Sequence, residues 1–198
     1  MTPRTTRLIL MAAAFATGLA LCFMVVLLVT GQAPIRKVQA SAIGGPFRMT
    51  DQNGRTVTDA DFKGHPYLVF FGFTHCPDVC PTTLFEMSEI MRKLGPDADK
   101  VNALFVTVDP ERDTPQVMKD YLGSFDPHLR GLTGTPDEVA AIAKGYRVYY
   151  KKVPQDGGEY TMDHTAIVYL MDKEGRFVTP FNAKKQPEEA AAELRRYL

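Results

Sequence analysis

The feature that most constrains the fold is a continuous apolar run, Tyr67–Phe73, followed closely by two cysteines, Cys76 and Cys80. A run of this length and composition is typical of a strand that is buried on both faces. The two thiols would then lie just beyond the carboxyl end of that strand. The remaining cysteine, Cys22, lies far away in an N-terminal hydrophobic segment. Cys76 and Cys80 are therefore each other's only expected intrachain partners.

Two thiols four positions apart can bind a soft metal or cycle between dithiol and disulfide. If a helix begins at residue 77, Cys76 lies near its N-terminus, where the helix dipole and free N–H groups favour a thiolate. Cys80 would lie one turn further along, on the same side. A structural disulfide and a buried apolar pair are the alternatives. Because Pro77, Asp78 and Pro81 shape a loop rather than a packing surface, a functional thiol pair is favoured.

The N-terminal segment 8–30 contains no charged residue and is long enough to span a bilayer as a helix. Arg36 and Lys37 follow it, and Ala40, Ser41 and Ala42 resemble a signal-peptide cleavage site. A cleaved signal peptide is thus the alternative to an anchor. The anchor is favoured because the apolar run is longer than a signal sequence requires and the basic pair separates it from the cleavage site.

We expect four segments: a cytoplasmic N-terminus at 1–7, a transmembrane anchor at 8–30, a linker at 31–44 and a single domain at 45–198. The basic residues flanking the span are nearly balanced, so orientation rests on the shortness of the N-terminal segment. The simplest location is a bacterial inner membrane with the domain in the periplasm. The chain balances 23 basic against 23 acidic residues, and no basic patch suggests nucleic acid as a partner.

Hydrophobic periodicity and turn residues predict an α/β domain. Asn53-Gly54 between two short polar-apolar runs predicts an N-terminal β-hairpin. Thr114-Pro115 and Thr135-Pro136 are start signals of two helices. The resulting order is compatible with a thioredoxin-like mixed sheet that has helices on both faces. Strands are expected at 47–50, 55–58, 67–73, 101–108, 148–153, 165–170 and 176–178, and helices at 84–94, from 115, at 136–144 and at 187–198.

A third ligand would complete a trigonal copper site beside the two thiols, and His164 is the candidate. It lies at the entry to a late strand that can return to the cysteine loop in a thioredoxin-like sheet. Asp163 and Asp78 are candidates to orient a ligand or balance its charge. A lone histidine is otherwise more often a satisfied loop or core residue. His75 should point away from Cys76, while His65 and His128 are expected in surface turns.

Two further features invite a functional interpretation but have simpler ones. Met162 could assist a copper ion only transiently, and Met87 and Met91 fit the core face of a helix. The residues 109–113 form an acidic cluster at a strand end, where ligand sites often open. A capped, solvated turn is the role expected for this cluster.

Three segments taken together resemble the SCO/SenC family: 73–81 with both cysteines, 108–115 with the acidic cluster, and 160–165 with His164. The resemblance covers essentially the whole domain, and the anchor fits as well. It implies a thioredoxin-like, membrane-anchored copper chaperone that assists assembly of the dinuclear copper centre in subunit II of cytochrome c oxidase. It also implies that Cys76, Cys80 and His164 are the copper ligands. An upstream periplasmic copper donor or thiol reductase would be a further partner.

The competing function is enzymatic. Cys76 and Cys80 could form a redox-active disulfide in a thiol–disulfide oxidoreductase, or Cys76 could attack a peroxide with Cys80 as the resolving thiol. Three residues rather than two separate the cysteines, the chain has no tryptophan, and an enzyme gives His164 no task. The sequence therefore favours a chaperone rather than an enzyme, with reductase activity as an auxiliary property of the metal-free form.

Overall fold

The computed structural model describes residues 3–31 and 43–198. Its contacts divide the chain after Ser41 into an N-terminal unit and a compact unit that ends at Leu198. Most of the predicted linker, including Arg36, Lys37 and the Ala40–Ala42 segment, lies outside the described residues.

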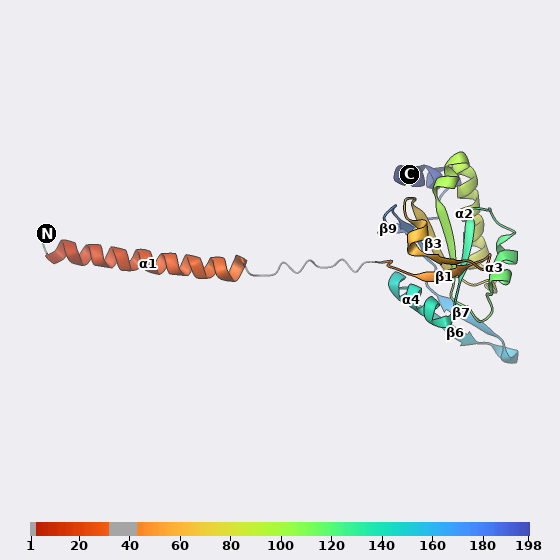
Figure 1. Ribbon diagram of the computed structural model, residues 1–198, viewed down its shortest axis with the longest axis horizontal. Coiled ribbons are helices and arrows are strands. Elements are labelled where there is room, and N and C mark those ends of the chain that lie inside the picture. The colour runs from red at the N-terminus through yellow and green to blue at the C-terminus, as the bar shows by residue number, and fades with distance from the viewer. Residues whose placement is uncertain (1–2, 32–42) are drawn as a thin grey trace. The chain divides into compact units, whose positions relative to one another are not determined.

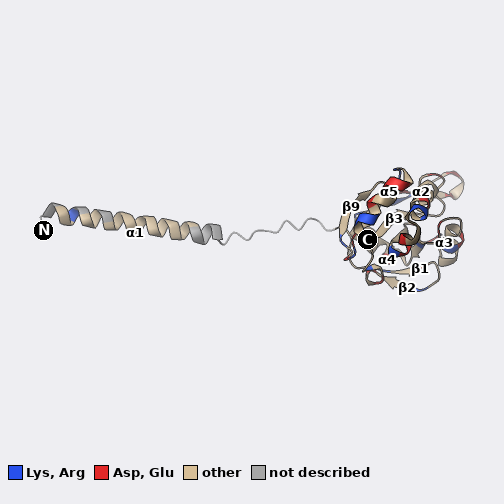
Figure 2. Ribbon diagram, turned by 90° about the horizontal axis from the view of Figure 1, so that it is seen from above, with Lys and Arg blue, Asp and Glu red and all other residues tan. Residues whose placement is uncertain are grey.

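The N-terminal unit contains helix α1, Pro3–Gly31 (Figure 1). Its stretch Thr5–Val26 has a mean hydropathy of 2.5, and is long and apolar enough to cross a membrane by length and composition. A signal sequence shares this property. In the described part of α1, charge is confined to the N-terminal end, whereas basic and acidic residues are interspersed over the domain (Figure 2).

The domain is built on a seven-stranded mixed sheet with the order β2-β1-β5-β4-β3-β8-β9. Strand β3 is central; it pairs in parallel with β4 and antiparallel with β8, and β4 pairs in parallel with β5. β1 and β2 form the predicted N-terminal hairpin. The strands are β1 Arg48–Asp51, β2 Thr56–Thr58, β3 Tyr67–Gly72, β4 Asn102–Thr107, β5 Leu129–Thr133, β8 Val168–Met171 and β9 Phe177–Phe181.

Strand β3 is buried on both faces, as its apolar run predicted. Alternate side chains of a strand point to opposite faces. The ring of Phe70 stacks on that of Phe105 in β4, with 6.0 Å between the ring centres. The Phe105 ring centre in turn lies 5.9 Å from that of Tyr121, which belongs to a helix. Phe71 contacts Tyr146 of a different helix at 5.4 Å. Helices therefore cover both faces of the sheet, and the core lies on either side of β3.

Two helices begin at threonines that cap them. The Thr114 side chain accepts a hydrogen bond from the Val117 N–H, and Thr135 and Glu138 form a reciprocal capping box. Both start signals read from the sequence are thus confirmed. The C-terminal helix packs against the helix that follows the cysteines. The helices are α2 Val79–Leu94, α3 Pro115–Leu122, α4 Pro136–Tyr146 and α5 Pro187–Leu194, with short 3-10 turns at Asp59–Phe62, Gly95–Lys100, Asp156–Gly158 and Arg195–Tyr197.

The sequence predictions missed or misplaced three strands. Strand β5 was not predicted, because Arg130 and Gly131 interrupt its apolar pattern. At Gly131 a Cβ would lie 2.8 Å from Leu122 Cδ1, so a larger residue would require the Leu122 side chain to move. The strand expected at 165–170 begins only at Val168. Residues Tyr150–Pro154 (β6) and Tyr160–His164 (β7) instead form a separate two-stranded sheet. His164 is therefore the last residue of a hairpin strand.

Candidate metal centre

The cysteine segment links the central strand to helix α2. β3 ends at Gly72 and α2 begins at Val79, so Cys76 lies in the loop and Cys80 in the first helical turn. The helix thus starts two residues later than residue 77, the start considered from the sequence. The backbone N–H of Cys80 nevertheless donates to Cys76 Sγ at 3.4 Å. The free amides of a helix N-terminus are therefore available to a thiolate at Cys76.

His164 reaches this loop from 84 positions further along the chain. Its Nε2 atom lies 3.6 Å from Cys80 Sγ, and one ligand atom each from Cys76, Cys80 and His164 all lie within 4.8 Å of one another. The other ring nitrogen, Nδ1, is 3.2 Å from the backbone carbonyl oxygen of Thr165. That carbonyl oxygen can accept a hydrogen bond from a protonated Nδ1. The unprotonated Nε2 is then free to face the two sulfurs.

Burial favours the uncharged forms of Cys80 and His164 in the metal-free protein. Cys76 and Cys80 are free thiols that are 9% and 0% exposed. Burial raises the pKa of the Cys80 thiol well above its usual range, and burial lowers the pKa of His164 despite the Thr165 carbonyl and the Asp163 charge. A neutral imidazole is ready to bind a metal, whereas a thiol must first release its proton.

Aromatic rings and a glycine shape the walls of the centre. The rings of Phe73 and Phe70 meet the His164 ring edge-on, at 5.8 and 6.4 Å. At Gly72, a Cβ would lie 2.7 Å from Cys80 Sγ and 2.6 Å from Phe105 Cε2. Gly72 therefore leaves the space that Cys80 occupies. Two thiol sulfurs and one imidazole nitrogen around such a space form a donor set suited to Cu(I) and acceptable to Cu(II).

The two aspartates considered as supporting groups are both exposed. Asp163 precedes His164 in β7, and neighbouring strand residues point to opposite sides. Among the described residues, the hydrogen-bond partner of His164 Nδ1 is the Thr165 carbonyl rather than Asp163. Asp78 is the N-cap residue of α2 and makes no capping hydrogen bond through its side chain. Sequence reasoning did not identify the Thr165 carbonyl.

The other sequence candidates have different surroundings. His75 is exposed, and its Nδ1 is 3.1 Å from Thr74 Oγ1. His128 lies between Asp126 and Asp99. Met162 is buried in the core, as are Met87 and Met91.

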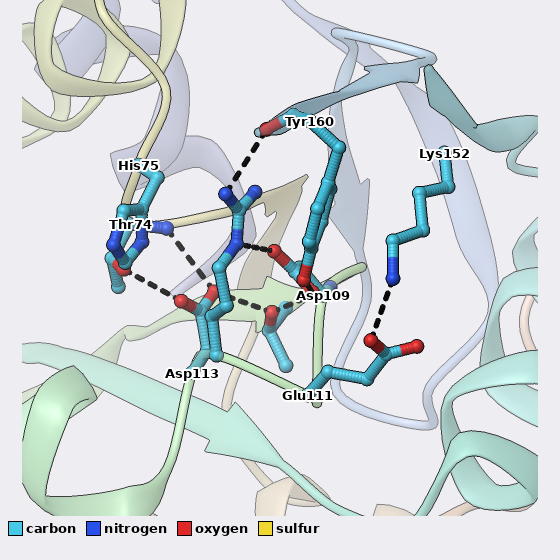
Figure 3. Close-up of polar contacts among 9 residues, drawn as sticks. Thr74, His75, Asp109, Glu111, Asp113, Lys152 and Tyr160 are labelled. Carbon is cyan, nitrogen blue, oxygen red and sulfur yellow. Dashed lines mark hydrogen bonds and ion pairs between the residues drawn. The ribbon is translucent and has the colours of Figure 1, made fainter. Parts of the chain in front are cut away.

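The acidic cluster 109–113 is not the solvated turn that the sequence suggested. Asp109 is 2% exposed and Asp113 is fully buried. The Asp113 carboxylate accepts hydrogen bonds from the Thr74 N–H (3.1 Å), Thr74 Oγ1 (2.6 Å) and Thr107 Oγ1 (2.6 Å), as Figure 3 shows in part. Threonines stand at or just after the ends of three neighbouring strands, and this pattern is the sequence signal that could have indicated a buried carboxylate. A buried carboxylate is retained only when its oxygens are satisfied in this way.

The chain is similar to known proteins in both fold and sequence. One solved structure, that of ScoI from Bradyrhizobium japonicum with copper bound, is 68% identical and has a TM-score of 0.78; the match covers 79% of this chain and 100% of that chain. BsSco, described as a member of the Sco family of cytochrome c oxidase assembly proteins, is 23% identical with a TM-score of 0.62, covering 80% and 95% of the two chains. The thioredoxin-like mixed α/β fold predicted from the sequence is thereby confirmed.

The human mitochondrial protein SCO1 homolog is 42% identical over 165 residues, which make up 80% of this chain and 54% of the human protein. The chain thus spans just over half the length of that relative, and 57% of the length of its mouse counterpart. The SCO1/SenC family model matches residues 36–198. Since that span includes the described domain with its Cys76, Cys80 and His164, the chain belongs to the SCO1/SenC family.

Proposed function

We propose that this protein is a copper chaperone that holds one copper ion through Cys76, Cys80 and His164. The observation that carries the proposal is the convergence of two sulfurs and one imidazole nitrogen within 4.8 Å, from segments 84 residues apart. This donor set matches the preference of copper for thiolate and imidazole ligands. The copper-bound state of the related ScoI supports the same choice of metal.

The copper ion is cargo, so the site must release as well as bind. Two thiolates are sufficient for a linear Cu(I) complex, and His164 would add the third ligand that Cu(II) needs more. An acceptor thiolate can then attack the bound ion while the donor ligands leave one at a time. Because the His164 side chain comes from a separate hairpin, it is the ligand that can leave first. We assign it as the labile arm of the site.

The acceptor is the dinuclear copper site of cytochrome c oxidase subunit II. The chaperone either delivers copper to this site or reduces its cysteines. Family membership and the assembly role stated for BsSco support this assignment. Helix α1 would anchor the chain in a bacterial inner membrane with the domain in the periplasm. That compartment is oxidising, so the thiols would require an upstream reductase as well as a copper donor.

The second candidate is a thiol–disulfide oxidoreductase, which the closeness of the two sulfurs favours. The burial of Cys80 argues against this residue as the attacking thiol, because a thiol whose pKa is raised supplies little thiolate at neutral pH. Reduction of acceptor cysteines by the metal-free protein remains compatible with the geometry as an auxiliary activity.

The decisive experiment measures copper stoichiometry on the fragment 43–198 with reduced thiols. This fragment corresponds to the compact unit of the structure and to the complete ScoI chain of the solved relative. Wild type, His164→Ala and the control His75→Ala are compared; His75 is an exposed histidine next to Cys76. We expect one tightly bound copper per chain in wild type and in the control, with weaker Cu(II) binding in His164→Ala.

Two results would overturn parts of this proposal. Absence of specific copper binding, together with ready reduction of disulfides or peroxide, would transfer the assignment to a thiol oxidoreductase. Equal loss of Cu(I) and Cu(II) in His164→Ala would leave the chaperone assignment intact and refute the labile role of His164.

A further inference from the structure

The residues 109–113, which we call the clamp turn, make hydrogen bonds both to Thr74, close to the cysteines, and to Tyr160 of the hairpin that carries His164 (Figure 3). The turn follows strand β4 and is closed by hydrogen bonds from the Arg112 and Asp113 N–H groups to the Asp109 carbonyl. Asp113 faces the segment that carries the cysteines, and Arg112 faces the hairpin that carries His164.

The cysteine side is held by Asp113. Its carboxylate accepts both the N–H and the hydroxyl of Thr74, two residues before Cys76, and also the Thr107 hydroxyl at the end of β4. The Asp113 carbonyl accepts the hydroxyl of Thr133 in β5 at 2.7 Å. The start of the cysteine loop is therefore tied to the ends of two neighbouring core strands.

The histidine side is held by Arg112. Its Nη1 donates to the Tyr160 carbonyl at 3.0 Å, and its guanidinium carbon lies 3.7 Å from the centre of the Tyr160 ring. Arg112 Nε and the Tyr160 hydroxyl both donate to the buried Asp109 carboxylate. Tyr160 is the first residue of β7 and His164 is the last. A planar, delocalised guanidinium suits this combination of stacking and hydrogen bonding.

Two further observations bear on the contacts between Arg112 and the hairpin. In the described part of the chain, β6 and β7 pair with each other and form no backbone ladder with the seven-stranded sheet. Arg112 Nη2 is buried and has no hydrogen-bond partner among the described residues. A buried unsatisfied donor is unusual and calls for a compensating role. The Arg112 guanidinium also lies 5.9 Å from the ring of Phe73, which contacts His164.

We propose that the clamp turn sets the spacing of the copper ligands, with Arg112 positioning His164 and Asp113 positioning the cysteine loop. This inference rests on the proposed copper-binding function. The two consecutive residues act on different ligands, so their effects on the two oxidation states of copper must differ. Neither residue contacts the metal; both are positioning residues.

The test compares Arg112→Ala, Arg112→Lys and Thr74→Val in the fragment 43–198. Thr74→Val removes the hydroxyl that donates a hydrogen bond to Asp113, while keeping the side-chain shape. Arg176→Ala is the matched control, since Arg176 also donates through Nε to an aspartate but is exposed on the β8–β9 turn. Each variant is first checked for cooperative thermal unfolding without metal; if Arg112→Ala does not fold, Arg112→Lys replaces it, because it keeps the charge but loses the planar fork.

We expect Arg112→Ala to weaken Cu(II) binding by about tenfold or more, as loss of a ligand-orienting group does, with Cu(I) binding changed by less than about threefold. Thiolate-to-Cu(II) absorption should shift in the same variant. Thr74→Val should weaken both oxidation states together, and Arg176→Ala neither. Arg112 variants that bind Cu(II) as the control does, or that lose both oxidation states equally, would overturn the proposal.

A second readout separates this inference from the proposed function. In the reduced, metal-free protein, nuclear magnetic resonance of the His164 ring should show an altered chemical shift in both Arg112 variants and no change in Arg176→Ala. If wild type bound no copper, the proposed function would fail, and this measurement would still decide whether Arg112 positions His164. An unchanged His164 signal in the Arg112 variants would refute the clamp.

Discussion

The cysteine half and the histidine half of the centre are built in different ways. Cys80 is fully buried behind the central strand β3, and the loop before it is anchored by the buried Asp113. His164 ends a two-stranded sheet whose other strand, β6, is exposed along much of its length. The rigid core therefore fixes the thiols, whereas side-chain contacts at the edge of the domain fix the imidazole.

This difference matches the demands of metal transfer. Stability varies across a protein, and segments with few buried apolar contacts open at lower free energy than the core. In the copper site proposed above, the thiol pair on the core would retain copper while the histidine on the hairpin could withdraw. Substitutions on the two halves should accordingly affect global stability to very different extents.

The largest effect is expected from Asp113→Ala on the cysteine half. The substitution leaves the buried Thr107 hydroxyl and the Thr74 N–H without their acceptor, which should lower the free energy of unfolding by about 3 kcal/mol. Urea denaturation of the metal-free fragment 43–198 measures this change in the free energy of unfolding. Asp120→Ala, at an exposed aspartate of α3, is the control. A loss no greater than that of the control would show that the cysteine loop does not depend on this carboxylate.

Gly72→Ala should have the next largest effect. The new methyl group would overlap Cys80 Sγ and the Phe105 ring, and overpacking of a core costs about 1–3 kcal/mol. We also expect Cys80 to become more reactive toward a thiol reagent, because the side chain must move from its buried position. Unchanged stability and thiol reactivity would mean that the cysteine half is softer than its burial indicates.

Tyr160→Phe should perturb the histidine half with a smaller global effect. The variant loses the hydroxyl that donates to Asp109 at 3.0 Å, a loss of about 1 kcal/mol. Amide hydrogen exchange should accelerate in β6 and β7 and remain unchanged in β3. Tyr149→Phe, at an exposed tyrosine next to β6, is the control. Faster exchange in β3 as well would contradict the independence of the two halves.

The smallest effect concerns protonation of two histidines. Burial lowers the pKa of His164 below its usual 6.5. At His128, burial also disfavours the charge, but hydrogen bonds to Asp126 and Asp99 outweigh it and raise the pKa. Stability from neutral His164 is thus present above pH 6.5 and lost as the pH falls toward its folded pKa. Stability from charged His128 is present below pH 6.5 and lost as the pH rises through its folded pKa.

A titration followed by nuclear magnetic resonance on the reduced, metal-free fragment tests this order. The His128 ring should titrate above pH 6.5 and the His164 ring below it. The reverse order would mean that His164 is solvated, and the histidine half would then be more open than its contacts with Phe70 and Phe73 indicate.

Contiguous segments were predictable because short-range chemistry determines them. The apolar run Tyr67–Phe73 predicted the buried strand, Thr114 and Thr135 predicted two helix starts, and Asn53-Gly54 predicted the hairpin. The four-residue spacing of Cys76 and Cys80 likewise indicated that both thiols would share one side of a helix start. Capping, turn geometry and the period of a strand each involve only neighbouring residues.

Only the tertiary structure decided what surrounds those thiols. The sequence did not reveal that Asp113 would be buried beneath Thr74, that β5 exists, or that His164 would arrive on a hairpin outside the main sheet. From the residues alone, His164 was one candidate among four histidines. The physical reason is distance along the chain: burial and pairing between segments 39 or 84 residues apart depend on how the whole sheet packs, and no local pattern encodes them.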